Sequence, residues 1–186
     1  MSFSPSLGWR ISRMCYSWVR LNRENVLRFC LMLGAWCAAR FGSADLSLGT
    51  CWGNSEMLQR IKSLEAQGII RDLHYVSADA LLLLYSGASL FAYPSVYEGF
   101  GLPVLEAMSS GVPVIFRAGT SMAEFAKGVC LLCETDEAEE LNVKISEILG
   151  SPLKQKEYSQ KGLIQAMCYS WARCAQETAR VYRSIS

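Results

Sequence analysis

The sequence predicts an α/β fold in which one open parallel sheet carries helices on both faces. Short apolar runs alternate with segments of helical apolar spacing from residue 14 to residue 133, and helical spacing continues to the end. The run at 89–95 (SLFAYPS) is largely apolar and aromatic, as in a strand that is buried on both faces of a parallel sheet. Repeated strand and helix units require parallel strands with right-handed crossovers. We therefore expect a single Rossmann-like domain over residues 14–186.

The expected strands are short runs rich in apolar residues. They span residues 14–19, 46–50, 72–76, 89–95, 112–116 and 129–133. Ahead of them, the first residues are rich in serine and include Pro5 and Gly8. Residues 1–13 are therefore expected to form a loose N-terminal segment.

Capping and breaking residues mark the helices between these strands. The expected helices span residues 26–40, 55–67, 77–85 and 103–111, and a fifth begins at 121. Ser77 is a typical N-cap, and Gly111 is a typical stop. Ser121, followed three residues later by Glu124, predicts a capping box, so Glu124 is interpreted as a structural cap rather than a ligand.

From residue 136 the pattern is helical, with breaks at Gly150, at Pro152 and near Tyr169. Apolar residues of the final helix fall roughly on one stripe. They are Trp171, Ala175, Ala179 and Tyr182. We expect these terminal helices to pack on the sheet.

Composition excludes several classes of protein. With 186 residues and 51% hydrophobic composition, the chain can bury a sizeable core, so it is not a disordered tail. Its 18 basic and 17 acidic residues give no electrostatic reason to expect nucleic acid or an anionic membrane as the main partner. No transmembrane helix is expected, because the run at 29–39 is too short and serines and a proline interrupt the run at 80–97.

Eight cysteines would suit a disulfide framework in a small secreted protein, but Arg10 and Arg13 break the first apolar stretch, so no signal peptide is visible. We expect free thiols and a cytoplasmic location, with peripheral attachment to a membrane left open. Cys130 and Cys133 form a lone CxxC whose side chains would point to opposite faces of a strand, and His74 is the only histidine. A zinc or redox site is therefore not expected, and neither is another metal.

Residues 98–106 (EGFGLPVLE) are the most informative segment for function. Gly99 and Gly101 give the backbone freedom for a turn after the strand at 89–95, and Pro103 suits the first position of a helix. The helix start leaves several backbone N–H groups unpaired at the positive end of the helix dipole. These groups form an anion site suited to phosphate, over the carboxyl edge of the sheet.

Two carboxylates flank this anion site. Glu98 lies in the loop, and Glu106 leans back toward the helix start because helical side chains tilt that way. A phosphate repels a carboxylate, so each is better suited to accept hydrogen bonds from neighbouring hydroxyl groups, as acidic residues do with ribose. Phosphate, ribose and a second polyol together indicate a nucleotide sugar. The alternative is that Glu106 only complements the helix dipole and that Gly99 and Gly101 only make a turn.

The run EGFGLPVLEA, followed by a short spacer and GVPVI, resembles the donor-binding signature of family 4 retaining glycosyltransferases, which have the GT-B fold. The segments YVSADALLLLYSGA, TSMAEF and SWARCAQETARVYRS resemble further parts of the carboxyl-terminal half of these enzymes. The resemblance implies that Glu106 holds the ribose diol and that Glu98 is the catalytic residue beside the donor sugar. It also implies that the loop contacts the sugar and the diphosphate through its backbone, at Gly99, Phe100, Gly101 and Leu102.

Two features depart from this family. The GT-B cleft lies between two Rossmann-like domains, and this chain has the length of one, so the acceptor-binding half is expected to be absent. Arg20 and Arg23 in the segment RLNREN are expected to neutralise the donor diphosphate, but Glu24 stands where a lysine is expected. The alternative for both arginines is an ordinary solvated turn.

Two functions follow from the resemblance. The first is the donor-binding half of a glycosyltransferase that transfers a hexose, with retention, from a nucleotide diphosphate sugar to a sugar or lipid-linked acceptor, without a metal or cofactor. An acceptor-binding domain would then act in trans, or the chain would self-associate through apolar surfaces left by the missing domain. The second is a non-catalytic fragment or a stand-alone nucleotide-binding or interaction domain. A Rossmann dehydrogenase is disfavoured, because no GxGxxG follows the first strand.

Overall fold

The computed structural model describes residues 14–17, 45–48, 55–67, 70–72, 76–95, 97–135 and 138–185. Some predictions fall outside these residues. They concern Arg20, Arg23, Glu24, His74, the segment 1–13 and the helix expected at 26–40. These predictions therefore stay predictions.

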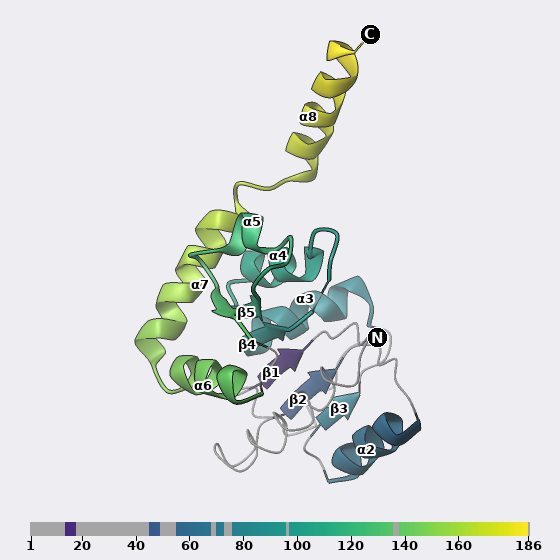
Figure 1. The fold of residues 1–186 in the computed structure, drawn as a ribbon, viewed down its shortest axis with the longest axis vertical. Helices are drawn as coiled ribbons and strands as arrows, with labels where there is room; N and C mark the ends of the chain where they lie inside the picture. Colours follow the sequence, from purple (N-terminus) through teal and green to yellow (C-terminus); the bar gives the residue numbers. More distant parts are fainter. Residues whose placement is uncertain are drawn as a thin grey trace.

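Six parallel strands form one sheet in the order β3-β2-β1-β4-β5-β6 (Figure 1). They are β1 (Met14–Ser17), β2 (Asp45–Leu48), β3 (Ile70–Asp72), β4 (Ala88–Tyr93), β5 (Val114–Arg117) and β6 (Leu131–Cys133). The predicted open parallel sheet is confirmed, and each strand overlaps its predicted range. Of the range expected for β3, Asp72 lies in the strand, and residues 73–75 fall outside the described residues. The strand order reverses between β1 and β4, and open parallel sheets bind ligands beyond the carboxyl ends of their strands at such a point.

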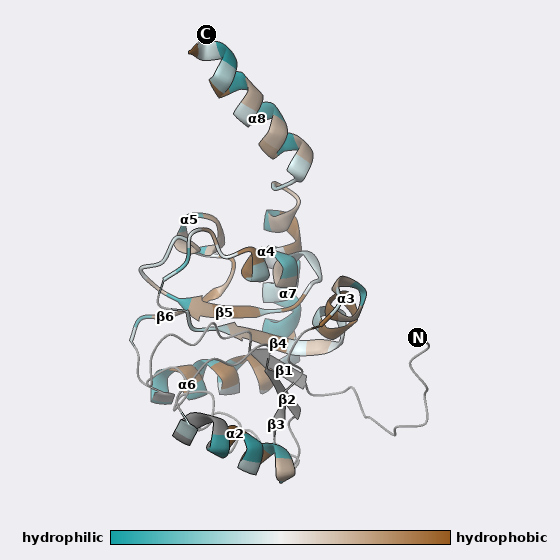
Figure 2. Cartoon of the chain, turned by 90° about the vertical axis from the view of Figure 1, so that its right-hand side faces the viewer, coloured by the Kyte–Doolittle hydropathy of each residue, from teal (hydrophilic) through white to brown (hydrophobic). Residues whose placement is uncertain are grey.

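Seven helices are present in the described residues. They are α2 (Ser55–Ala66), α3 (Ala78–Gly87), α4 (Leu102–Ser109), α5 (Ala123–Ala126), α6 (Ala138–Leu149), α7 (Pro152–Ala166) and α8 (Trp171–Ser184). Helices α3, α4 and α5 lie on one face of the sheet, and α2 and α6 lie on the other (Figure 2). The predicted cap of α3 is confirmed, because Oγ of Ser77 accepts a hydrogen bond from the N–H group of Ala80 at 3.4 Å. None of these helices combines the length and apolar character that crossing a membrane requires.

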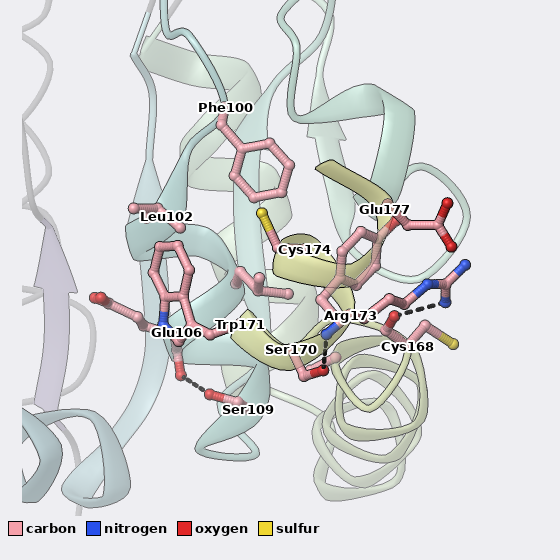
Figure 3. A pocket seen from close by; sticks show the side chains of 13 residues that line it. Phe100, Leu102, Glu106, Ser109, Cys168, Ser170, Trp171, Arg173, Cys174 and Glu177 are labelled. Carbon is pink, nitrogen blue, oxygen red and sulfur yellow. Dashed lines mark hydrogen bonds between the residues drawn. The ribbon is translucent and has the colours of Figure 1, made fainter. Parts of the chain in front are cut away.

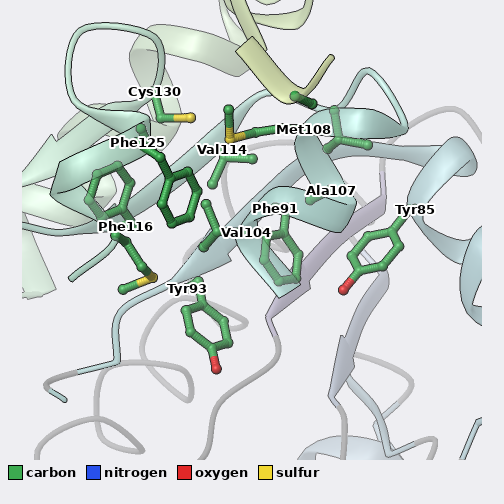
Figure 4. Close-up of a cluster of buried hydrophobic side chains, with 14 residues drawn as sticks. Tyr85, Phe91, Tyr93, Val104, Ala107, Met108, Val114, Phe116, Phe125 and Cys130 are labelled. Carbon is green, nitrogen blue, oxygen red and sulfur yellow. The ribbon is translucent and has the colours of Figure 1, made fainter. Parts of the chain in front are cut away.

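The core is centred on β4, which is buried on both faces. Leu90 and Phe91 are neighbours in this strand, so they point to opposite faces, and both are fully buried. Phe91 joins Val104 and Met108 of α4 and Phe116 of β5 in one apolar cluster (Figure 4). Burial of each large apolar side chain of this kind stabilises the fold by about 1.5–3 kcal/mol. The expected doubly buried strand is therefore confirmed.

The terminal helices do not all pack on the sheet. Helix α6 lies against the sheet, and α7 packs on α4, where Met108 contacts Gly162. Helix α8 begins after its N-cap, Ser170, and projects away from the rest of the chain with no buried residue (Figure 1). The predicted packing of this last helix on the sheet is therefore wrong. Helical spacing shows that one face of α8 is apolar, but it does not say which surface covers that face.

The turn before α4 depends on Gly101, the N-cap residue of this helix. Its φ of 93° lies in the left-handed region, which residues with a side chain rarely adopt. A Cβ at Gly101 would lie 2.4 Å from Cγ of Met122, whereas a Cβ at Gly99 would meet no atom within 4 Å. Pro103 follows as the second helical residue, where its missing N–H leaves no helical hydrogen bond unmade. The backbone angle and the close contact together restrict position 101 to glycine.

The substitution Gly101→Ala is expected to lower the free energy of unfolding by about 2 kcal/mol or more, because it combines a left-handed backbone with overpacking. Gly99→Ala is the matched control in the same loop and should change this free energy by less than about 0.5 kcal/mol. Urea titration followed by circular dichroism measures both variants. Equal effects at the two positions would contradict the turn described above.

Cys130 and Cys133 are buried thiols, and their burial predicts low reactivity. Burial raises the pKa of each to about 12, and the charge of Glu140 adds to the increase at Cys133. A thiol with so high a pKa stays protonated at neutral pH, so both should resist alkylation of the native protein while the exposed Cys168 and Cys174 react. Mapping of iodoacetamide adducts by mass spectrometry measures the four rates. Comparable rates at the buried and exposed thiols would contradict this expectation.

Candidate functional site

The segment 98–106 begins in the loop at the carboxyl end of β4 and continues into α4. Because β4 neighbours β1 where the strand order reverses, this loop borders the crevice in which open parallel sheets bind ligands. The predicted position of the segment at this edge of the sheet is therefore confirmed.

Free backbone donors lie at the start of α4. The first helical hydrogen bonds run from the N–H groups of Val104 and Leu105 to the carbonyl oxygen of Gly101, at 3.0 and 3.5 Å. Within the described part of the chain, the N–H groups of Phe100, Gly101 and Leu102 donate to no acceptor. They stand at the positive end of the helix dipole, so this turn can hold an anion such as phosphate.

Glu98 is held by three hydrogen bonds. Its Oε1 accepts from the hydroxyl groups of Tyr93 and Ser95, both at 2.8 Å, and its carbonyl oxygen accepts from the hydroxyl group of Ser121 at 2.8 Å. The predicted capping box of Ser121 and Glu124 is therefore wrong, because α5 has no side-chain cap. Sequence spacing could not reveal this use of Ser121, since its partner lies 23 residues away in another loop.

Glu106 also receives a hydroxyl donor. Oη of Tyr85, near the end of α3, donates to Oε2 of Glu106 at 3.2 Å. Tyr85 is buried and Glu106 is exposed, so the phenol reaches from the core to the surface. Burial, together with the charge of Glu106, raises the pKa of Tyr85 far above its usual range. Tyr85 therefore remains a protonated donor at every physiological pH.

Phe91 lies between the two tyrosines that hold these glutamates. Its ring meets Tyr85 edge to face with 5.4 Å between centroids, and it stacks on Tyr93 with 5.8 Å between centroids. Figure 4 shows the two phenol oxygens at the same border of the apolar cluster. Tyr93 also contributes to the raised pKa of Tyr85, as expected of two nearby phenols. Glu98 and Glu106 are thus held from one face of β4, at the end where α4 begins.

Aromatic contacts fix the middle of the loop. The ring of Phe100 stacks on Phe125 of α5 with 4.9 Å between centroids and meets Tyr169 with 6.3 Å between centroids. A pocket of about 880 Å³ opens between the first turns of α4 and α8 (Figure 3). Its lining includes Phe100, Glu106 and Trp171. Glu106 therefore faces a space large enough for a ligand.

Sequence reasoning identified both glutamates and the glycine turn but missed the residues that support them. Tyr93 and Ser95 precede Glu98 by five and three residues, so hydroxyl groups close to the loop were a usable signal. No sequence signal marks Tyr85, because its hydrogen bond to Glu106 joins two helices across 21 residues. Such pairings arise from packing and not from local spacing.

The described residues place neither the predicted arginines nor a metal ion beside this turn. Arg20 and Arg23, the predicted partners of the diphosphate, fall outside the described residues. In the part of the chain that is described, no three His, Cys, Asp or Glu side chains gather closely enough to hold a metal ion. Among the described residues, the groups of this turn that can attract an anion are the backbone N–H groups at the positive end of the helix dipole.

Comparison with known proteins identifies relatives of this chain. The family model described as "Glycosyl transferases group 1" matches residues 51–164. O-antigen chain mannosyltransferase B of Escherichia coli is 36% identical over 134 residues, which cover 72% of this chain and 35% of that protein. MMP alpha-(1->4)-mannosyltransferase of Mycolicibacterium hassiacum is 30% identical over 126 residues, which cover 66% of this chain and 31% of that protein. The chain thus spans about a third of the length of these relatives.

Solved structures share the fold of this chain. Sucrose-phosphate synthase from Thermosynechococcus elongatus matches 96% of this chain and 47% of its own, with a TM-score of 0.76 and 24% identity. HepE from Anabaena, solved in complex with UDP and glucose, matches 93% of this chain and 49% of its own, with a TM-score of 0.77 and 19% identity. The chain therefore belongs to the group 1 glycosyltransferases, and its fold is that of the carboxyl-terminal domain of a GT-B enzyme.

Proposed function

We propose that this chain is the donor-binding half of a retaining glycosyltransferase and that it binds a nucleotide diphosphate sugar at the loop 98–106. The observation that carries the proposal is the gathering of free N–H groups and two hydroxyl-held carboxylates at the start of α4. An anion suits the N–H groups, and ligand hydroxyl groups suit the carboxylates. A nucleotide sugar offers both kinds of group, since a diphosphate separates its ribose from its sugar.

The diphosphate is proposed to bind the backbone of the turn. The N–H groups of Phe100, Gly101 and Leu102 would donate to its oxygens and stabilise the charge that develops as it leaves the sugar. Arg20 and Arg23 would add positive charge to the same place. This arrangement requires neither a metal nor a cofactor for neutralisation, because fixed dipoles and basic side chains supply it.

The two ends of the ligand are proposed to meet the two glutamates. Glu106 would bind the ribose diol through Oε1, and Glu98 would meet the donor sugar through Oε2. Among the described residues, these two oxygens have no protein donor, whereas the other oxygen of each carboxylate does. At Gly99 the space where a side chain would begin is open, so the sugar can approach the backbone there.

The relatives favour mannose as the transferred hexose. Two proteins similar to this chain are named as mannosyltransferases. We therefore propose a mannosyl nucleotide as the donor and a sugar or lipid-linked molecule as the acceptor. The cytoplasmic location inferred from the cysteines belongs to the same proposal, because it rests on sequence composition alone.

A second candidate is a nucleotide-binding domain that catalyses no reaction by itself. The residues of this chain match 35% of O-antigen chain mannosyltransferase B and 47% of the sucrose-phosphate synthase chain, and they form one Rossmann-like domain. One Rossmann-like domain cannot enclose a donor and an acceptor in a cleft that excludes water. Glycosyl transfer would then also need an acceptor-binding domain.

Helix α8 offers a surface through which copies of this chain could associate. Trp171 is 78% exposed and Tyr182 is 68% exposed, although both lie on the apolar stripe of the helix. Exposed apolar surface of this kind is typical of protein interfaces. We propose that this stripe makes the isolated chain self-associate.

Calorimetric titration with GDP and UDP tests the donor site. Binding of one nucleotide with a micromolar Kd is expected, and Glu106→Ala should weaken it about ten-fold to a hundred-fold, because hydrogen bonds from the ribose to a charged group are lost. Glu139→Ala is the control, since Glu139 is an exposed acidic residue in the first turn of α6. The proposal fails if neither nucleotide binds, or if Glu106→Ala binds as tightly as the unmodified chain.

Sedimentation velocity at several concentrations tests the role of α8. The unmodified chain is expected to form larger species as its concentration rises, and Trp171→Glu with Tyr182→Glu should keep it monomeric, because charge in an apolar interface is costly. Gln176→Glu with Arg180→Gln makes the same change in net charge away from the stripe and should leave association intact. A monomeric unmodified chain at every concentration would contradict self-association.

A further inference from the structure

Two buried phenols reach from the core to the two glutamates of the site. Tyr85 donates to Oε2 of Glu106 at 3.2 Å, and Tyr93 donates to Oε1 of Glu98 at 2.8 Å. The exposed fraction of each tyrosine is only 3% or 4%, whereas Glu106 is exposed and Glu98 is half-buried. Each carboxylate that faces the site is therefore joined to the interior by one phenol.

Packing against Phe91 restricts the rotamers of both tyrosines. Phe91 is fully buried and contacts both rings, edge to face at Tyr85 and stacked at Tyr93. Aromatic pairs in these arrangements are favourable beyond their burial, and a tightly packed ring has little rotamer freedom. The two hydroxyl groups are thus fixed points relative to β4.

A fixed donor has a specific consequence for a surface glutamate. An unheld glutamate samples several rotamers and loses that freedom when it binds a ligand. A hydrogen bond from a rigid phenol selects one rotamer beforehand, holds one oxygen and leaves the other oxygen for the ligand. Glu98 has an additional donor in Ser95, which also holds Oε1 at 2.8 Å.

A hydroxyl donor, unlike a cation, does not offset the negative charge of the carboxylate that it holds. A lysine or arginine in its place would neutralise the glutamate and weaken its attraction for ligand hydroxyl donors. The high pKa of Tyr85 means that this phenol does not become a second negative charge beside Glu106 at physiological pH. The carboxylates are therefore oriented without being paired with a cation among the described residues.

We propose that Tyr85 and Tyr93 are positioning residues, Tyr85 orienting Glu106 toward the ribose diol and Tyr93, with Ser95, orienting Glu98 toward the donor sugar. The inference rests on the proposed function, because it assigns the two ends of the nucleotide sugar to the two glutamates. Neither phenol is proposed to touch the ligand. Their effect on binding passes entirely through the carboxylates.

Tyr85→Phe removes the hydroxyl group and keeps the packed ring. Its effect is measured as the ratio of Kd for 2′-deoxy-GDP to Kd for GDP, or for the uridine pair where the chain binds UDP. The unmodified chain should prefer the ribonucleotide, and Tyr85→Phe should lower that preference about three-fold to ten-fold, because the deoxynucleotide keeps only its 3′-hydroxyl group for Glu106 and therefore loses less affinity. In Glu106→Ala the preference should be gone, and adding Tyr85→Phe should change nothing further.

Tyr93→Phe with Ser95→Ala removes both donors to the carboxylate of Glu98. Its effect is measured as the ratio of Kd for GDP to Kd for GDP-mannose, or for UDP and UDP-glucose where the chain binds uridine nucleotides. This variant should weaken binding of the nucleotide sugar about three-fold to ten-fold relative to the nucleotide diphosphate, and it should leave the ribose preference unchanged. Tyr158→Phe on α7 is the control for loss of a phenol elsewhere and should alter neither ratio.

The pattern of the two ratios separates positioning from a structural role. A variant that binds every ligand more weakly by the same factor has lost structure, and that result overturns the proposal, as does an unchanged ratio in both variants. Thermal unfolding monitored by circular dichroism accompanies each titration. An unmodified chain that binds neither nucleotide overturns the proposed function itself, whereas binding with ribose preference that Tyr85→Phe does not alter overturns only the positioning role.

Discussion

Burial of β4 on both faces is the constraint on which the rest of the described structure depends. Phe91 and Leu90 fix this strand between two layers, and the strand ends where the ligand crevice of the sheet opens. The same core that holds the strand also holds Tyr85 and Tyr93, whose hydroxyl groups reach Glu106 and Glu98. Hydrophobic packing therefore sets the orientation of the polar groups at the site.

The glycine turn is held from its other side by the segment that follows β5. Ser121 donates to the carbonyl oxygen of Glu98, Met122 lies against Gly101, and Phe125 stacks on Phe100. These three contacts come from one short segment, residues 121–125. The loop thus lies between the β4 core and the connection from β5 to α5. Contacts on both sides hold its backbone N–H groups in place without a ligand. A preorganised anion site requires donors that are held in this way.

The sequence predicted the sheet well because each strand carries its own local signal. Each of the six strands overlaps an expected run, although β3 shares only Asp72 with its range, and the turn at 98–106 was recognised because glycine, proline and glutamate occur there at informative spacing. What it did not predict depends on contacts between distant segments. Ser121 fits a capping box by spacing, yet its hydroxyl group instead donates to the carbonyl oxygen of Glu98. The apolar stripe of α8 likewise indicates an interface, but helical spacing does not identify the surface that covers it.

Two carboxylates beside the turn at 98–106 restrict which ligand the turn could bind. The N–H groups of the turn attract negative charge, whereas Glu98 and Glu106 repel it on either side of the turn. Because hydroxyl donors and not cations hold the two glutamates, their charges remain available for that repulsion. If Glu98 faces the donor sugar as proposed, a nucleoside triphosphate would place its last phosphate against this carboxylate, while a neutral sugar would offer it hydroxyl groups. The same charges that would recognise the sugar would therefore disfavour a longer chain of phosphates.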